Sequence, residues 1–287
     1  MISGKARVAG VIGWPASHSA SPFLHNYWLE QYGIDGAYVP LAVAPENLDA
    51  ALRGLAGLGL AGVNVTVPHK ESALAAMDQI DSAAQRIGAV NTIVISETGA
   101  LTGSNTDGFG FVENLRAGVT GWNAGEGPAV VIGAGGAARA VCAALIDEGV
   151  PGIRIANRTR ARADALADAL GNPLNVVGWD ERDSALDGAA LVVNTTTLGM
   201  TGAPPLDLAL DALPATAVVN DIVYAPLETP LLGAARARGN PAVDGLGMLL
   251  HQARPGFKAW FGHDPEVTGA LRDHVLADLE RRAGGRG

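Results

Sequence analysis

Short apolar runs alternate with helical patterns along most of the chain. The runs are rich in Val and Ile, as is typical of strands that are covered on both faces. They predict strands at 8–12, 37–41, 63–67, 89–95, 130–132, 153–156, 191–194 and 218–221. Helices are predicted between them, and from Gly247 onward the pattern is helical only. This alternation indicates an α/β fold with mainly parallel sheets and right-handed crossovers.

Composition and charge narrow the classes of function. Apolar residues make up 48% and charged residues 17% of the 287 residues, which indicates a globular rather than a disordered chain. The net charge of −9 makes nucleic acid and anionic membranes poor partners. No apolar segment has the length of a membrane span, and Pro15 ends the first apolar run too early for a signal peptide. The lone Cys142 cannot form an internal disulfide, so we expect a cytoplasmic protein.

A glycine-rich turn follows the strand at 130–132. Its sequence is Gly133-Ala134-Gly135-Gly136-Ala137-Ala138, which matches G-x-G-x-x-G/A. The first glycine permits the tight turn, the second lets the backbone approach a pyrophosphate, and the final alanine lets the helix pack close to the strand. The motif alone is weak, because glycine is abundant here and an ordinary strand–helix turn would look the same.

The end of the next strand indicates which dinucleotide binds. An NAD site usually has Asp or Glu at this point to hold the ribose hydroxyls. This chain instead has Asn157-Arg158-Thr159-Arg160-Ala161-Arg162. A solvated basic helix start is less attractive, since cations there oppose the helix dipole. Guanidinium groups bind phosphate with planar, bidentate geometry, so we predict NADP(H) rather than NAD(H).

Three polar clusters follow strands in the first part of the chain. The first, Gly13–Pro22, places serines beside a helix N-terminus and suggests a carboxylate pocket, although Ser21 could simply cap the helix. The second, Asn64–Lys70, puts two polar residues on one strand face and ends in a lysine that could donate a proton to an alkoxide. The third contains Asn91, and Asp107 follows after one more turn. Asp107 is either the partner of the lysine or a helix cap.

These blocks, taken in order, resemble the shikimate dehydrogenase family over nearly the whole chain. The matching blocks are G-x-P-x-x-H-S-x-S-P at 13–22, N-V-T-V-P-x-K at 64–70, G-A-V-N-T at 88–92, N-T-D-G at 105–108, the glycine turn, N-R-T at 157–159, D-I-V-Y-A-P at 221–226 and G-L-G-M-L-L-H-Q-A at 245–253. The resemblance implies NADPH-dependent reduction of 3-dehydroshikimate to shikimate, a step of chorismate and aromatic amino acid biosynthesis.

The resemblance also implies roles for individual residues. Lys70 is the catalytic lysine and Asp107 its partner. The substrate contacts are Ser19, Ser21, Thr66, Asn91, Tyr224 and Gln252. The cofactor segments are Gly133, Ala134, Gly135, Gly136, Ala137, Asn157, Arg158, Thr159, Arg160, Ala161 and Arg162, with Ile222 and Gly245 on the nicotinamide side. Ala20 and Ile222 depart from the basic residue and the methionine common at these positions, which affects cofactor positioning and affinity rather than the reaction class.

Two domains are expected. Residues 1–105 and 244–287 would form a discontinuous substrate-binding domain, to which the last helices return, and 106–243 a Rossmann-type NADP-binding domain. No metal is expected, because neither H-E-x-x-H nor Cys/His ligand spacing occurs. A quinate or aminoshikimate dehydrogenase remains an alternative, as does a catalytically silent NADP(H)-binding sensor. The sequence does not distinguish a monomer from a homodimer.

Overall fold

The chain divides into two compact units in the computed structural model, which describes residues 2–284 (for 283 and 284 the backbone only). Unit 1 contains the described residues up to Thr106 and from Gln252 onward, and unit 2 contains Asp107–His251. The helix α9 (Gly269–Gly284) thus belongs to the first unit, and α8 (Leu246–Phe261) contributes residues to both. In the part of the chain that is described, no helix combines the length and hydropathy needed to cross a bilayer.

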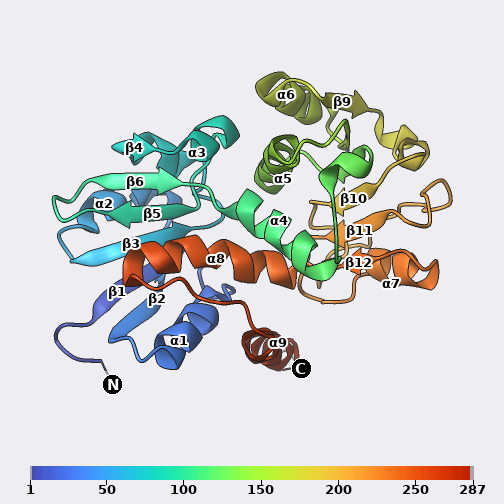
Figure 1. Cartoon of the computed structure of the whole chain (residues 1–287). Coiled ribbons are helices and arrows are strands. Elements are labelled where there is room, and N and C mark those ends of the chain that lie inside the picture. The colour runs from blue at the N-terminus through green and yellow to red at the C-terminus, as the bar shows by residue number, and fades with distance from the viewer. Residues whose placement is uncertain (1, 285–287) are drawn as a thin grey trace. The chain divides into compact units, whose positions relative to one another are not determined.

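The sheet of unit 1 is mixed. Its strands, in spatial order among the described residues, are β2 (Gly36–Ala42), β1 (Arg7–Gly13), β3 (Leu60–Val65), β5 (Thr92–Ile95), β6 (Leu101–Ser104) and β4 (Gln79–Ile80). β1 pairs in parallel with both β2 and β3, whereas β5 is antiparallel to β3 and β6. The carboxyl ends of β1 and β3 therefore meet at one edge of the sheet, from which the first two polar clusters continue (Figure 1).

Helices cover both faces of this sheet. They are α1 (Ser21–Gln31), α2 (Leu48–Gly54), α3 (Ser82–Ile87) and the part of α8 that belongs to this unit, with 3-10 turns η1 (Pro45–Asn47) and η2 (Ser72–Ala76), and α9 (Gly269–Gly284) packs against α1. One face packs Ile12, Val63 and Val65 against leucines of α2. The other face buries aromatic side chains, among them Tyr38, Trp28 and Trp260. This division follows from the strand geometry, because successive side chains point to opposite faces.

The sheet of unit 2 is entirely parallel among the described strands. Their spatial order is β12 (Ala242–Val243), β11 (Val218–Asp221), β10 (Leu191–Asn194), β7 (Ala129–Ile132), β8 (Ile153–Ala156) and β9 (Leu174–Val177). Read from β9 to β12 and numbered along the chain within this unit, that order is 3-2-1-4-5-6, the order of a Rossmann fold. The order reverses between β7 and β10, and ligands of such sheets bind outside the strand ends at that point.

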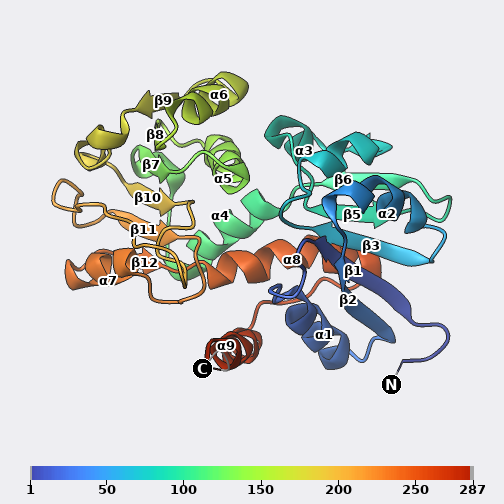
Figure 2. The same ribbon diagram turned by 180° about the vertical axis from the view of Figure 1, so that it is seen from behind.

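Helices also cover both faces of the second sheet, as Figure 2 shows from behind. One core unites Phe111, Val141 and Leu166 with the sheet; these belong to α4 (Asp107–Gly118), α5 (Gly136–Asp147) and α6 (Arg160–Leu170). The opposite core is formed by α7 (Pro230–Ala237), the turns η4 (Trp179–Glu181) and η5 (Ser184–Leu186), and leucines between 206 and 213. A short 3-10 turn, η3 (Ala124–Glu126), precedes β7.

The predicted elements differ from the structure mainly at their ends. The strands predicted at 153–156, 191–194 and 218–221 match β8, β10 and β11. The third strand ends at Val65, so Thr66 lies beyond it rather than on a shared strand face with Asn64. The strand predicted from Ala89 begins at Thr92, and the helical segment predicted after the third strand, from Lys70 onward, is the 3-10 turn η2. Four strands were missed: β4, β6, β9 and β12. β4 and β12 have only two residues each, and β6, with the sequence L-T-G-S, lacks β-branched apolar residues.

Candidate active site

The first two polar clusters lie side by side in unit 1. A Cβ added to Gly13 would lie 2.6 Å from Cγ2 of Thr66. The amide of Trp14 donates to the carbonyl of Val67 at 3.2 Å, and that of Thr66 donates to the carbonyl of Ile12 at 2.9 Å. Only glycine permits this approach at position 13, so the end of β1 and the segment after β3 form one surface.

The serine loop, residues 14–20 after β1, ends at the N-terminus of α1. The hydroxyl oxygen of Ser19 accepts a hydrogen bond from the amide of Ser21 at 3.2 Å. The N-cap residue of α1 is Ala20 and Ser21 is the first helical residue, so the expectation that Ser21 caps the helix is wrong. Because Ser19 accepts with its oxygen, its hydroxyl proton is left to donate to a ligand.

A buried hydrogen-bond network begins in the second cluster. The Tyr38 hydroxyl donates to Oδ1 of Asn64 at 2.6 Å, and Nδ2 of Asn64 donates to the Asn91 carbonyl and the Thr92 hydroxyl at 3.1 Å each. The side chains of Tyr38, Asn64 and Asn91 are almost fully buried. Both polar atoms of the Asn64 amide are thus satisfied, which fixes its orientation between β2 and the segment before β5.

The network continues to three predicted substrate-contact segments. Oδ1 of Asn91 accepts from the amide of Thr106 at 2.9 Å, and its Nδ2 lies 3.4 Å from Oε1 of Gln252. The Thr106 hydroxyl donates to the Gln252 carbonyl at 2.8 Å. Residues 91, 106 and 252 are far apart in sequence, and unit 1 brings them together. Tyr38 was not predicted as a site residue, because a strand tyrosine by itself is typical of packing. Asn64 was marked as part of the second polar cluster but was given no role of its own.

The predicted acid–base pair is divided between the two units. Lys70 belongs to unit 1 and is half-buried, and its carbonyl accepts from the amide of Val90 at 2.8 Å. Asp107 belongs to unit 2, where it is the first residue of α4 and is buried. Gly108 lets α4 approach α5 closely, since an added Cβ would lie 3.0 Å from that of Ala144. The pairing of Lys70 with Asp107 stays a prediction.

The glycine turn of unit 2 fits a dinucleotide. Gly133 has φ of 115°, and a Cβ there would lie 2.5 Å from the Thr195 hydroxyl. That hydroxyl donates to the Ile132 carbonyl at 2.7 Å, joining the ends of β7 and β10 at the point where the strand order reverses. Gly135 precedes α5 without a side-chain cap, and added Cβ atoms on Gly135 and Gly136 would meet no heavy atom within 4 Å. The free helix N-terminus can therefore be approached by a diphosphate.

Two guanidinium groups at the end of β8 are available for a further phosphate. Arg158 and Arg162 are exposed, and neither side chain makes a hydrogen bond or ion pair with another described residue. Arg160, by contrast, lies 3.6 Å from Asp164. Nδ2 of Asn157 donates to the Thr159 carbonyl at 2.8 Å and shapes the turn. Thr159 is the N-cap residue of α6, but its hydroxyl makes no capping bond there.

The predicted nicotinamide-side residues adjoin each other in unit 2. A Cβ on Gly245 would collide with the Ile222 backbone and lie 2.8 Å from the Val223 carbonyl oxygen. The half-buried Tyr224 follows on the same segment. The loop is held by Asp221, which is fully buried and accepts from the Thr229 hydroxyl at 2.7 Å and from the Val223 amide at 3.0 Å. Burial raises the pKa of Asp221, and these bonds offset part of that rise.

One supporting segment of unit 2 was not predicted to contain site residues. Asn194 ends β10 and is followed by Thr195 and Thr196, and Nδ2 of Asn194 donates to Oδ1 of Asp221 at 3.0 Å. The signal was a polar run directly after an apolar strand, the same signal that identified the other clusters. Cys142, in contrast, is fully buried in α5, and burial raises the pKa of its thiol to about 12, which makes it an inert packing residue.

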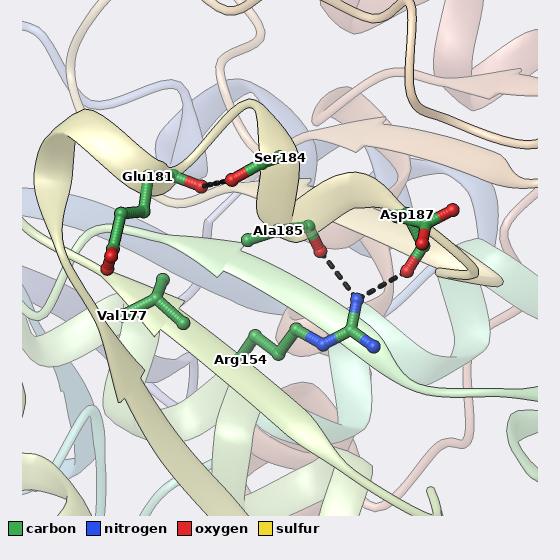
Figure 3. A pocket seen from close by; sticks show the side chains of 6 residues that line it. All are labelled: Arg154, Val177, Glu181, Ser184, Ala185 and Asp187. Atoms are coloured by element: carbon green, nitrogen blue, oxygen red, sulfur yellow. Dashed lines mark hydrogen bonds between the residues drawn. The ribbon is translucent and has the colours of Figure 1, made fainter.

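A surface hollow in unit 2 has a structural explanation. It has a volume of about 310 Å³ and is lined by Arg154, Val177, Glu181, Ser184, Ala185 and Asp187 (Figure 3). The Arg154 guanidinium donates at 2.6 Å to the carbonyls of Ala185 and Asp187, which fastens η5 to the sheet. The Arg154 guanidinium in this hollow therefore stabilises the fold itself. Among the described side chains, no cluster of His, Cys, Asp or Glu is arranged to hold a metal ion.

Comparison with known proteins identifies the family. Family models match residues 11–93 (shikimate dehydrogenase substrate binding domain), 121–199 (shikimate / quinate 5-dehydrogenase) and 245–273 (shikimate 5'-dehydrogenase C-terminal domain). A shikimate dehydrogenase (NADP(+)) of Rhodospirillum rubrum is 65% identical over 280 residues, covering 96% of this chain and 99% of the relative.

Solved structures give the same result. A shikimate 5-dehydrogenase of Thermus thermophilus, solved with NADP(H) and shikimate, is 38% identical with a TM-score of 0.83, covering 96% of this chain and 99% of that one. A quinate dehydrogenase of Corynebacterium glutamicum, solved with NAD, is 33% identical with a TM-score of 0.88, covering 95% and 99%. The motif resemblance is thus confirmed along nearly the full length, and the chain belongs to the shikimate dehydrogenase family.

Proposed function

We propose that this chain catalyses the NADPH-dependent reduction of 3-dehydroshikimate to shikimate, with unit 1 as the substrate-binding domain and unit 2 as the cofactor domain. The observation that carries the proposal is the hydrogen-bonded network of Asn91, Thr106 and Gln252, which gathers three motif segments at one place in unit 1. Such a preorganised polar cluster suits a small, polyhydroxylated ligand, because its donors and acceptors need no rearrangement on binding.

The residues of unit 2 fit NADP(H). Gly133–Ala137 and the N-terminus of α5 would hold the diphosphate, and the exposed guanidiniums of Arg158 and Arg162 would hold the 2′-phosphate. Asn157, Thr159, Arg160 and Ala161 would complete that loop, and Ile222 and Gly245 would lie on the nicotinamide side. When bound, NADPH supplies the hydride for the ketone carbon.

The protein's own part in the reaction is proton transfer and orientation. Lys70 polarises the substrate carbonyl oxygen and donates the proton that the new hydroxyl requires. Asp107 keeps the lysine charged and accepts a hydrogen bond from the neighbouring hydroxyl. Ser19 and Ser21 bind the carboxylate with hydroxyl groups beside the N-terminus of α1, and Thr66, Asn91, Tyr224 and Gln252 contact the remaining oxygens.

Localisation and partners are proposed alongside the reaction. We place the protein in the cytoplasm, which the single, fully buried cysteine supports. Neither nucleic acid nor membrane is proposed as a partner, given the net charge of −9. A homodimer is the assembly to be tested, by light scattering of the purified chain.

One set of assays tests the function and its alternatives. Shikimate oxidation is measured with NADP and with NAD, and quinate is assayed in parallel. We expect shikimate with NADP to give the highest kcat/KM. Preference for quinate with NAD would point to the other branch of the family, and NADP binding without turnover of either acid would indicate a sensor. Ser19→Ala should raise the KM for shikimate, and an unchanged KM would contradict the carboxylate pocket.

A further inference from the structure

The C-terminal helix reaches the serine loop through one side chain. Nη1 of Arg282, in the last turn of α9, donates to the carbonyl of Ser19 at 3.2 Å and to that of His18 at 3.4 Å. Both partners lie in unit 1, in which α9 packs beside α1 (Figures 1 and 2). The contact joins positions 263 and 264 residues apart in sequence. It therefore couples the end of the chain to the loop that carries Ser19.

The Arg282 side chain is itself held in place from two sides. Its Nε lies 2.6 Å from Oδ2 of Asp278, whose side chain is 5% exposed, while that of Arg282 is 31% exposed. The guanidinium carbon lies 5.1 Å from the ring centre of Phe23, on the first turn of α1. A buried carboxylate needs a partner, and the ring restricts the guanidinium plane, so the donors remain aimed at the loop carbonyls.

The serine loop needs such a restraint. Residues 14–20 lie between β1 and α1 without regular secondary structure, and the Ser19 side chain bonds to the amide of Ser21. Fixing the Ser19 carbonyl fixes the backbone from which its hydroxyl projects. The family model for the C-terminal domain ends at residue 273, before α9 reaches Arg282. Arg282 lies outside the motif blocks and outside the residues that the family models match.

We propose that Arg282 is a positioning residue for the substrate carboxylate: it holds the loop of His18 and Ser19 in its binding conformation and touches no substrate itself. The inference rests on the proposed function, because it assigns the carboxylate to this loop. A preorganised loop loses less conformational entropy on binding. Loss of the anchor should therefore weaken shikimate binding while leaving hydride and proton transfer nearly unchanged.

The test compares Arg282→Ala with the adjacent Arg281→Ala. Arg281 is a matched control, because it also lies over the Phe23 ring and also pairs with Asp278, with Nη2 3.6 Å from Oδ1. It is exposed, however, and donates to the Ala277 carbonyl of its own helix rather than to the serine loop. Arg282→Ala should raise the KM for shikimate by roughly 10-fold, the worth of about one charge-assisted hydrogen bond. The kcat and the KM for NADP should stay close to wild type, and Arg282→Lys should recover part of the affinity.

A second measurement does not depend on turnover. Hydrogen exchange at the amides of residues 16–21 should be faster in Arg282→Ala than in wild type, and unchanged in Arg281→Ala. Asp278→Asn keeps Arg282 but weakens the ion pair that holds it. This variant should also raise the KM for shikimate and speed hydrogen exchange, and it replaces Arg282→Ala if that variant does not fold. Unchanged KM and unchanged exchange in Arg282→Ala would overturn the inference, as would equal effects in Arg281→Ala. If wild type fails to turn over shikimate, the proposed function fails, and the exchange data still decide whether the loop is anchored.

Discussion

Replacement of His25 by phenylalanine should remove a defined part of the pH dependence of folding. The His25 ring is fully buried in α1, stacked on Tyr38 with ring centres 4.0 Å apart and surrounded by Trp28, Phe257 and Trp260. Neither ring nitrogen makes a hydrogen bond of acceptable geometry to the residues that the structure describes. Burial lowers the pKa of His25 to about 3, and the nearby Asn64 side chain offsets only part of this effect.

The sign and size follow from proton binding. Above pH 6.5 the imidazole is neutral in both the folded and unfolded states and contributes no pH dependence. As the pH falls below 6.5, only the unfolded state takes up the proton, so the free energy of unfolding decreases until the pH nears 3. At about 1.4 kcal/mol per pH unit, the loss at pH 5 is about 2 kcal/mol. Burial raises the pKa of the stacked Tyr38 well above 10, so the phenol stays neutral throughout this range.

Urea unfolding followed by tryptophan fluorescence measures this loss, because Trp28 and Trp260 lie against the ring. The free energy of unfolding is compared between pH 7.5 and pH 5 for wild type, His25→Phe and a control at the exposed His263. His25→Phe should show a pH-dependent loss about 2 kcal/mol smaller than wild type, whatever its stability at pH 7.5. The control should follow wild type. If the free energy of unfolding fell by the same amount between pH 7.5 and pH 5 in His25→Phe and in wild type, the reasoning would be refuted.

Four further substitutions test the site. Lys70→Ala should lower kcat by ~100- to 10,000-fold with a smaller change in KM, and near-normal turnover would reject the lysine as proton donor. Arg158→Ala should raise the KM for NADPH by roughly 10-fold or more and leave that for NADH nearly unchanged; an equal effect on both would argue against 2′-phosphate recognition. Tyr38→Phe removes the 2.6 Å bond to Asn64 and should lower the free energy of unfolding by about 1–3 kcal/mol in urea titrations, and a neutral outcome would show that the network tolerates its loss. Gly245→Ala forces the backbone at Ile222 to move and should cost about 1–3 kcal/mol of stability, so wild-type melting would contradict the contact.

Local sequence pattern was sufficient to predict the α/β class, most of the buried strands and the glycine-rich turn between β7 and α5. These features are local: a parallel strand is a short apolar run, and a dinucleotide turn must place its glycines at fixed spacing after such a run. Polar residues at the ends of apolar runs likewise mark Asn64, Asn91 and Thr66 in the sequence. The exact ends of the elements were less predictable, because they depend on pairing with other strands. β5, for example, begins at Thr92, where pairing with β3 starts, rather than at the predicted Ala89.

Tertiary packing alone established which distant residues support the site. The stacking of His25 on Tyr38, the bond from Tyr38 to Asn64 and the contact of Arg282 with the Ser19 carbonyl all join segments that no local pattern relates. A histidine on a helix, a tyrosine in a strand and an arginine near the C-terminus are each ordinary in sequence. Their roles arise from burial and from the partners that chain folding brings within hydrogen-bonding distance, and these are properties of the packed molecule rather than of any window of sequence.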